Sequence, residues 1–262
     1  MSYTAVDGAE LWVEDTGGEG PVVVLLHGAA GSSECWTQQT PAFVAAGYRV
    51  IAPDLRGFGK TRAVPGLEAA GSIAGDLAAL VQKLALPAVF LVATAYGGFG
   101  ALEYALDNPA SLRALVVSTS FGGLTDSEFT AMRARHIRPD LASLPLEQRE
   151  LGASYLASDP DGVKRFLTMA QQGSHGEGQQ RQSLRHATTL TRLESMRAPS
   201  LIIAADEDLY APPPVMQVFA EHIPGAQFAV IEGAGHCAYW EKPETWNALV
   251  LDFLANQAAV TG

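Results

Sequence analysis

The sequence predicts an α/β protein built on a mostly parallel, doubly wound sheet. Short apolar runs alternate with helical patterns along most of the chain, and these runs are continuously apolar rather than alternating in polarity. A continuous apolar run is typical of parallel strands that are buried on both faces. Strands and helices that alternate in this way connect through right-handed crossovers into a single sheet with helices on both sides.

The elements follow one another in a regular order. We expect strands at residues 22–26, 49–52, 88–93, 112–117, 201–205 and 228–231. We expect helices between or after them at about 72–85, 97–107 and 243–257. The last of these begins with Pro243, which is a favourable first helical residue. In such sheets the chemistry lies just beyond the carboxyl ends of the strands.

One stretch, at about residues 122–197, interrupts this rhythm because it contains helical patterns and no convincing strand. It holds ten Lys+Arg and nine Asp+Glu, a net charge of +1, whereas the rest of the chain holds seven and nineteen, a net charge of −12. We expect an inserted helical cap at 122–197 on a core made of 1–121 and 198–262. An ordinary solvated helical segment would also explain the charge bias.

Composition narrows the class of protein. The 262 residues carry a net charge of −11, with 48% hydrophobic and 17% charged residues, which is a globular composition. The acidic balance argues against nucleic acid as a partner, and two cysteines cannot form a disulfide framework. No apolar run is long enough to span a membrane, and the N-terminus lacks the pattern of a secretion signal. We therefore expect a cytoplasmic protein with a small-molecule partner.

Cofactor and metal motifs are missing from the sequence. Gly59-Lys60-Thr61 resembles the end of a phosphate-binding loop, but that pattern requires glycine where this chain has Asp54. There is no dinucleotide-binding glycine fingerprint and no cluster with the sequence spacing of metal ligands. The expectation is a protein that uses neither a cofactor nor a metal.

Chemistry-bearing residues follow three of the expected strands. The first strand ends at His27-Gly28-Ala29-Ala30-Gly31, a turn of small residues with free backbone N–H groups. The third strand enters a helix directly through Ala93-Thr94-Ala95-Tyr96-Gly97. Asp208 and His236 follow later strands. We expect these three places to meet at one edge of the sheet.

The chain resembles the α/β-hydrolase fold family over nearly its full length. The resemblance rests on these motifs together with the segment DLRGFG at 54–59, Pro212 after Asp208, and Gly235 before His236. The closest resemblance is to its carboxylesterase, haloperoxidase-like, enol-lactone hydrolase and C–C bond hydrolase branch. The resemblance implies a cofactor-independent hydrolase of a small ester, lactone or activated C–C bond. It also implies His236 as base, Asp208 as its orienting acid, and the N–H groups of Ala29 and Tyr96 as the oxyanion hole.

The nucleophile of this family is absent, because the elbow should read G-x-S-x-G and position 95 is alanine. A methyl group cannot attack a carbonyl carbon. One interpretation is that Ala95 is an engineered replacement of a parent serine. A second is a natural lyase, tautomerase or cofactor-free oxygenase that uses His236 as general base. A third is a receptor that binds a ligand without turnover.

Other residues were weighed for the missing roles. Thr94 is adjacent to the elbow tip but should point away from the histidine, and Ser118 and Ser120 follow a different strand. Cys35 and Cys237 are expected to be buried small hydrophobic residues rather than nucleophiles. For the acid, Asp206 and Glu207 compete with Asp208, which we prefer because the family places its acid four residues before the proline at 212.

The sequence also suggests residues around the pocket. We expect substrate contacts from Trp36, Arg56, Phe121 and Trp240, although large aromatic residues lie in the core more often than at a ligand. The arginines of the expected cap favour an anionic substrate, held by a residue such as Arg133, Arg135, Arg138 or Arg185. The alternative is that these arginines pair with acidic neighbours or face the solvent.

Overall fold

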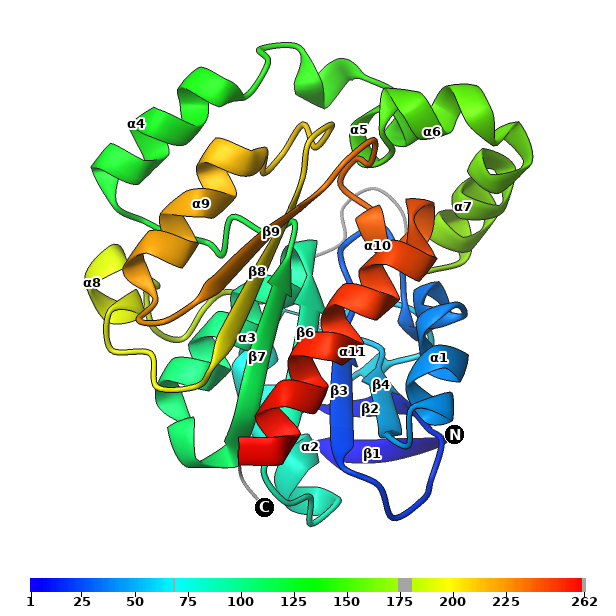
Figure 1. The fold of residues 1–262 in the computed structure, drawn as a ribbon. Helices are drawn as coiled ribbons and strands as arrows, with labels where there is room; N and C mark the ends of the chain where they lie inside the picture. Colours follow the sequence, from blue (N-terminus) through cyan, green and yellow to red (C-terminus); the bar gives the residue numbers. More distant parts are fainter. Residues whose placement is uncertain (68, 174–180, 261–262) are drawn as a thin grey trace.

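The computed structural model describes residues 1–67, 69–173 and 181–260. Its centre is a nine-stranded sheet in the order β1-β2-β4-β3-β6-β7-β8-β9, with β5 paired to β2 (Figure 1). The strands are β1 (Ser2–Val6), β2 (Ala9–Asp15), β3 (Val22–Leu26), β4 (Arg49–Pro53), β5 (Arg62–Ala63), β6 (Val89–Thr94), β7 (Leu112–Ser118), β8 (Ser200–Ala205) and β9 (Gln227–Ile231). The predicted fold class is confirmed.

The six expected strands form the parallel part of the sheet, from β4 through β3, β6, β7 and β8 to β9. Strands β1, β2 and β5 were not predicted, and all of their pairings are antiparallel. In β2 buried residues alternate with more exposed ones, because this edge of the sheet is covered on one face only. A strand of alternating polarity contains no continuous apolar run, so that pattern does not predict it.

Helices cover both faces of the sheet. They are α1 (Gln39–Ala45), α2 (Ile73–Lys83), α3 (Ala95–Asp107), α4 (Ser127–His136), α5 (Leu146–Glu150), α6 (Ala153–Ser158), α7 (Pro160–Gly173), α8 (Leu190–Leu193), α9 (Pro213–His222), α10 (Ala238–Glu241) and α11 (Pro243–Val260). The core has two halves: α2, α3 and α9 pack on one face, and α1 and α11 pack on the other. Helix α3 starts two residues before the expected position, at Ala95 itself.

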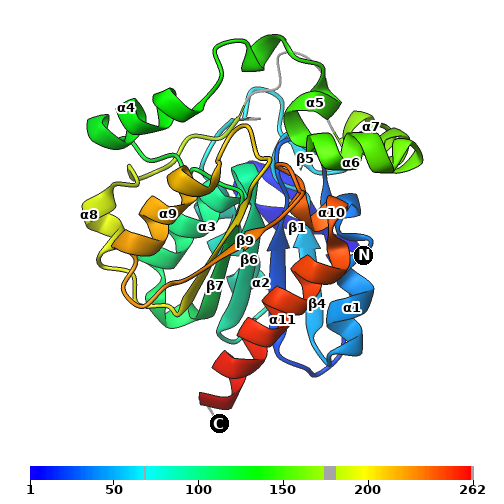
Figure 2. The ribbon, with the colours of Figure 1, turned by 45° about the horizontal axis from the view of Figure 1, so that its top comes forward.

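The described part of residues 122–197 contains helices joined by turns and loops, and one isolated bridge between Leu124 and Thr188. Helices α4 to α7 lie beyond the end of the sheet (Figures 1 and 2), whereas α8 packs beside α9. Residues 174–180 of the expected link lie outside the described residues. Over the described ranges, no helix is long and apolar enough to cross a membrane.

The register of the parallel strands brings the expected motifs to one edge. Leu26 pairs with Ala93, and Thr94 pairs with Ser118. Ser118 pairs in turn with Ile203, near the end of β8. The loops that follow β3, β6 and β8 therefore leave the sheet at a common level, and helices α4 to α7 lie above them.

Candidate active site

The turn from β6 into α3 is strained at its tip. Ala95 has a φ of +48°, in the left-handed region that costs a non-glycine residue about 1–2 kcal/mol. The neighbouring glycines make the turn possible: a Cβ on Gly97 would lie 2.6 Å from the carbonyl oxygen of Leu26, and one on Gly28 would lie 2.9 Å from the Ala95 methyl carbon. Strain of this kind is held only where the surrounding structure fixes it, and it clusters at functional sites.

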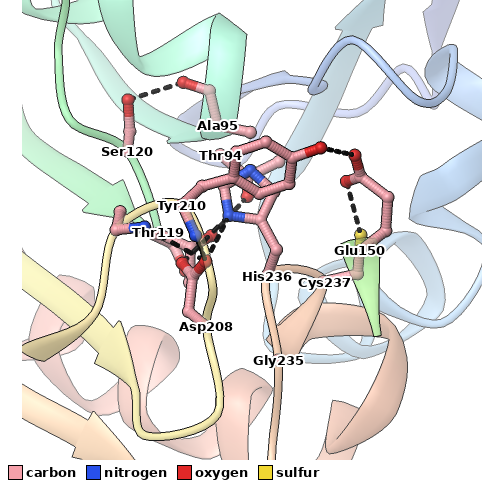
Figure 3. A network of polar contacts seen from close by, with 12 residues as sticks. Thr94, Ala95, Thr119, Ser120, Glu150, Asp208, Tyr210, Gly235, His236 and Cys237 are labelled. Atoms are coloured by element: carbon pink, nitrogen blue, oxygen red, sulfur yellow. Dashed lines mark hydrogen bonds and ion pairs between the residues drawn. The ribbon is translucent and has the colours of Figure 1, made fainter. Parts of the chain in front are cut away.

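The carbonyl of Ala95 is fixed as well, because the Ser120 hydroxyl donates a hydrogen bond to it at 2.5 Å (Figure 3). The hydroxyl groups of Thr94 and Thr119 lie 3.1 Å apart. Ser118 accepts a hydrogen bond from the Trp246 indole. These three hydroxyl groups therefore take part in contacts that support the turn and the sheet.

The histidine and the acid form a pair. Nδ1 of His236 donates to Asp208, at 2.9 Å from Oδ2 and 3.0 Å from Oδ1 (Figure 3). Both residues are buried, and the N–H groups of Tyr210 and Ala211 donate to Oδ1 of Asp208. Burial alone would lower the pKa of His236, but the Asp208 carboxylate outweighs it and the pKa rises to about 8. The pair therefore presents Nε2 as the free ring nitrogen.

The three acidic residues after β8 have different contacts. Asp206 accepts from the N–H of Gly233 at 2.7 Å, and Glu207 accepts from the N–H of Ser154 at 2.8 Å. Asp208 alone among the three contacts the imidazole of His236. This geometry favours Asp208, which was preferred from its distance to Pro212.

A cavity of about 270 Å³ opens between the sheet edge and the helices above it. Ala95 and His236 both line it, as do Ala29 and Tyr96, the two residues expected at the oxyanion hole. Tyr96 lies in the first turn of α3, where backbone N–H groups have no partner within the helix. The remaining lining residues are Ala30, Phe99, Phe121, Arg133, Leu141, Glu150, Arg181 and Tyr210.

The cavity wall carries charged and polar groups that the sequence had only partly suggested. Arg133, one of four arginines expected near an anion, lies with its guanidinium carbon 3.7 Å from the centre of the Phe121 ring. Its Nε donates to the carbonyl of Tyr210 at 3.3 Å. Arg181, Glu150 and Tyr210 were missed. Glu150 and Arg181 reach the cavity from helix α5 and from a segment after α7, and Tyr210 reaches it from the loop after β8, so their positions depend on tertiary packing.

Three of the expected substrate contacts lie elsewhere. The Arg56 guanidinium is buried, donates to both oxygens of Asp76 at 2.7 and 3.0 Å, and lines a separate cavity. Trp36 is buried in the core, with its ring 4.8 Å from that of Tyr239. Trp240 packs on Phe166 at 5.8 Å. Phe121 alone of the four lines the cavity beside His236.

The other three arginines that were expected to bind an anionic substrate do not line this cavity. Arg135 is exposed. Arg138 pairs with Asp140 at 2.6 Å on the surface. Arg185 lines the same separate cavity as Arg56. For these three the alternative holds, since they face solvent, a neighbouring acid or another hollow.

The thiols and the first histidine have structural surroundings. Burial raises the pKa of both Cys35 and Cys237, which disfavours the thiolate form, and neither residue lines the cavity. Nδ1 of His27 donates to the carbonyl of Gly28 at 2.7 Å, and its Nε2 accepts from the N–H of Leu55 at 2.9 Å. With both ring nitrogens occupied, His27 shapes the turn.

One cluster among the described residues has the proximity of metal ligands. Oxygen and nitrogen atoms of Glu103, Asp107 and His186 lie within 4.8 Å of one another. The cluster is outside the cavity, and Arg192 already contacts Asp107 at 2.8 Å. In the part of the chain that the structure describes, the cavity itself contains no such group.

Comparisons with known proteins give matches to one fold family over most of the chain. A family model for the alpha/beta hydrolase fold matches residues 21–243. A 2-hydroxy-6-oxononadienedioate/2-hydroxy-6-oxononatrienedioate hydrolase of Comamonas testosteroni is 30% identical over 91% of this chain and 89% of its own length.

Two solved structures superpose on nearly the whole chain. A thermophilic esterase from Thermogutta terrifontis has a TM-score of 0.79 at 27% identity, with 97% of both chains covered. The enol-lactonase of Burkholderia xenovorans has a TM-score of 0.77 at 20% identity, covering 97% of this chain and 100% of its own, and supports the fold alone. The match of the family model, which includes Ala95, Asp208 and the sheet around them, shows that this chain belongs to the α/β-hydrolase fold family.

Proposed function

We propose that this chain has the site of a cofactor-independent hydrolase for a small ester, lactone or activated C–C bond, in which Ala95 replaces the serine of a parent enzyme. The observation that carries the proposal is the strained backbone of Ala95 in the same cavity as the His236–Asp208 pair. A chain with no use for a nucleophile would gain stability by relaxing that turn. The hydrolase and esterase relatives support the same reaction class.

The proposed mechanism assigns one task to each group. A serine hydroxyl at position 95 would attack the carbonyl carbon, and Nε2 of His236 would take its proton and later return it to the leaving group. Asp208 fixes the tautomer through Nδ1 and stabilises the imidazolium. The N–H groups of Ala29 and Tyr96 would stabilise the oxyanion. Water would then release the acyl group by the same route.

We further propose that helices α4 to α7 form the cap of this site and that the substrate carries a carboxylate. Arg133 supports this because it is half-buried at the cavity and makes no ion pair among the described residues. Arg181, with its guanidinium carbon 5.5 Å from the Tyr96 ring centre, adds a second positive charge. The C. testosteroni relative is named for a dioate substrate, and the T. terrifontis esterase was solved with malate bound.

The test is the hydrolysis of p-nitrophenyl acetate, and of a carboxylate-bearing ester such as p-nitrophenyl succinate, by the chain with Ala95→Ser. Restoring a nucleophile should raise turnover by on the order of 10⁴–10⁶ over the chain as it stands. Ala30→Ser is the matched control, since it also adds one hydroxyl to an alanine of the cavity wall, away from the elbow tip.

Three other outcomes would point away from the proposed function. Equal turnover by the chain with and without Ala95→Ser would contradict the nucleophile's position. Consumption of a ligand by the unaltered chain, abolished by His236→Ala, would favour a lyase, tautomerase or cofactor-free oxygenase that uses the histidine as general base. Binding without consumption in either form would favour a receptor.

A further inference from the structure

Glu150 is a carboxylate in the cavity wall with no task in the mechanism above. It is the last residue of α5, and its side chain lies near the histidine pair (Figure 3). Oε1 accepts a hydrogen bond from the Tyr210 hydroxyl at 3.2 Å, and Oε2 accepts a weak one from the Cys237 thiol at 3.8 Å. The carbonyl of Glu150 also accepts from the N–H of Cys237, the residue after His236, at 2.9 Å.

Tyr210 connects this carboxylate to the imidazole. Its ring centre lies 4.6 Å from that of His236, with the two planes inclined by 47°. Its backbone N–H donates to Asp208 at 2.7 Å. One residue therefore contacts the face of the histidine, the acid that orients the histidine, and a carboxylate that comes from a helix beyond the sheet.

The charges that face His236 come from several elements. The carboxylates of Asp208, Glu150 and Glu241 favour the imidazolium when ionised, while Arg133 lies across the cavity. Burial raises the pKa of Glu241 to about 7, which weakens its contribution near neutral pH. Glu241 is already engaged, since it accepts from the N–H groups of Gly235 and Gly152. Among the described residues Glu150 forms no ion pair with a Lys, Arg or His side chain. Its charge is therefore not neutralised by a partner and remains available to the ring.

We propose that Glu150 is a positioning residue for His236, whose carboxylate holds the Tyr210 ring against the imidazole and stabilises the imidazolium. Because Glu150 belongs to α5, the environment of the histidine depends on the position of this helix. Two effects are combined here, one of contact and one of charge, and two substitutions separate them. Glu150→Gln keeps an oxygen that accepts from Tyr210 but removes the charge, whereas Tyr210→Phe keeps the charge and the ring but removes the hydrogen bond.

The charge is tested by NMR titration of His236 in the chain with Ala95, which requires no turnover. We expect Glu150→Gln to lower the pKa of His236 by roughly half a unit to one unit, because a negative charge near the imidazolium is lost. Glu147→Gln is the matched control, since it removes the same charge from the same helix without lining the cavity, and it should leave the pKa unchanged. Equal pKa values in the two variants would overturn the proposal.

The contact is tested by kinetics in the Ala95→Ser background, and this arm alone rests on the proposed function. Tyr210→Phe should lower kcat by on the order of tenfold with KM nearly unchanged, because the imidazole is less firmly placed. An unchanged kcat would overturn the positioning role. If Glu150→Gln does not fold, Glu150→Asp replaces it: it keeps the charge but shortens the reach to Tyr210, so kcat should fall while the pKa of His236 stays raised.

Discussion

The two sides of the cavity differ in what they retain. On one side, Asp208 and His236 form a complete pair, buried and supported by backbone N–H groups. On the other side, the elbow keeps its strained backbone at Ala95 and its close contacts with glycine but carries no reactive atom. In this chain the strained turn therefore forms with a methyl group at its tip, and the close contacts that surround it come from glycines near position 95.

The largest effect should come from the complete side. In an Ala95→Ser background, Asp208→Asn should lower kcat by roughly 10³–10⁴, because an amide cannot orient the histidine tautomer as the carboxylate does. Asp206→Asn is the matched control, and it should cost far less, because Asp206 contacts only the N–H groups of Gly233 and Ala234. The opposite ranking of the two kcat values would show that the wrong carboxylate has been assigned.

The sequence could predict the elbow and the pair because both depend on local patterns at strand ends. The continuous apolar runs of β3, β6 and β8 located those ends, and the parallel register brought them together. The cavity wall could not be predicted in this way. Arg56 was expected there, but it pairs with Asp76, twenty residues away on α2, and only the packing of that helix places them together.

The same limit explains the residues that were missed. Glu150 and Arg181 reach the cavity from segments whose position is decided by tertiary packing, so no strand end marks them. Tyr210 follows Asp208 by two residues, and its contact with the imidazole depends on the path of that loop. Local patterns therefore predicted the elbow turn and the His236–Asp208 contact, whereas the residues of the cavity wall required the structure.

The pH dependence of kcat/KM tests the histidine side of the cavity. With a pKa of about 8, His236 is protonated in most molecules at pH 7, and only its neutral form can take a proton from a serine. In the Ala95→Ser chain, kcat/KM should therefore rise about tenfold between pH 7 and a plateau above about pH 9. A pH–rate profile checks this. A plateau that begins below pH 6.5 would mean that Asp208 does not raise the pKa of the histidine.

A substitution in the cavity wall near the His236–Asp208 pair should have a smaller effect, on KM. Arg133→Ala should raise KM for p-nitrophenyl succinate several-fold in the Ala95→Ser background, because a half-buried cation facing the cavity is lost. The effect should weaken as ionic strength rises. Arg135→Ala, which removes an exposed arginine from the same helix, serves as the control. Equal KM values for the two variants at low salt would leave the substrate's carboxylate without support.

The smallest effect concerns the strain at the elbow. Ala95→Gly should raise the free energy of unfolding by up to about 1 kcal/mol, since glycine adopts a φ of +48° without steric cost. Ala101→Gly, in the same helix α3 at an ordinary helical position, should lower it by about 1 kcal/mol or more. Denaturant unfolding of both variants measures this. A loss of stability in Ala95→Gly would mean that the turn is not strained.

The most direct test of the proposal that the site lacks only its nucleophile is covalent labelling. The chain with Ala95→Ser is incubated with diisopropyl fluorophosphate, whose phosphorus bonds to an activated serine oxygen as fluoride leaves and the histidine takes the proton. Mass spectrometry of the intact chain and its peptides should show one adduct, on the peptide that contains position 95, and none in the unaltered chain or after His236→Ala. No adduct with Ala95→Ser, or an adduct on another serine such as Ser120, would contradict an intact catalytic geometry around position 95.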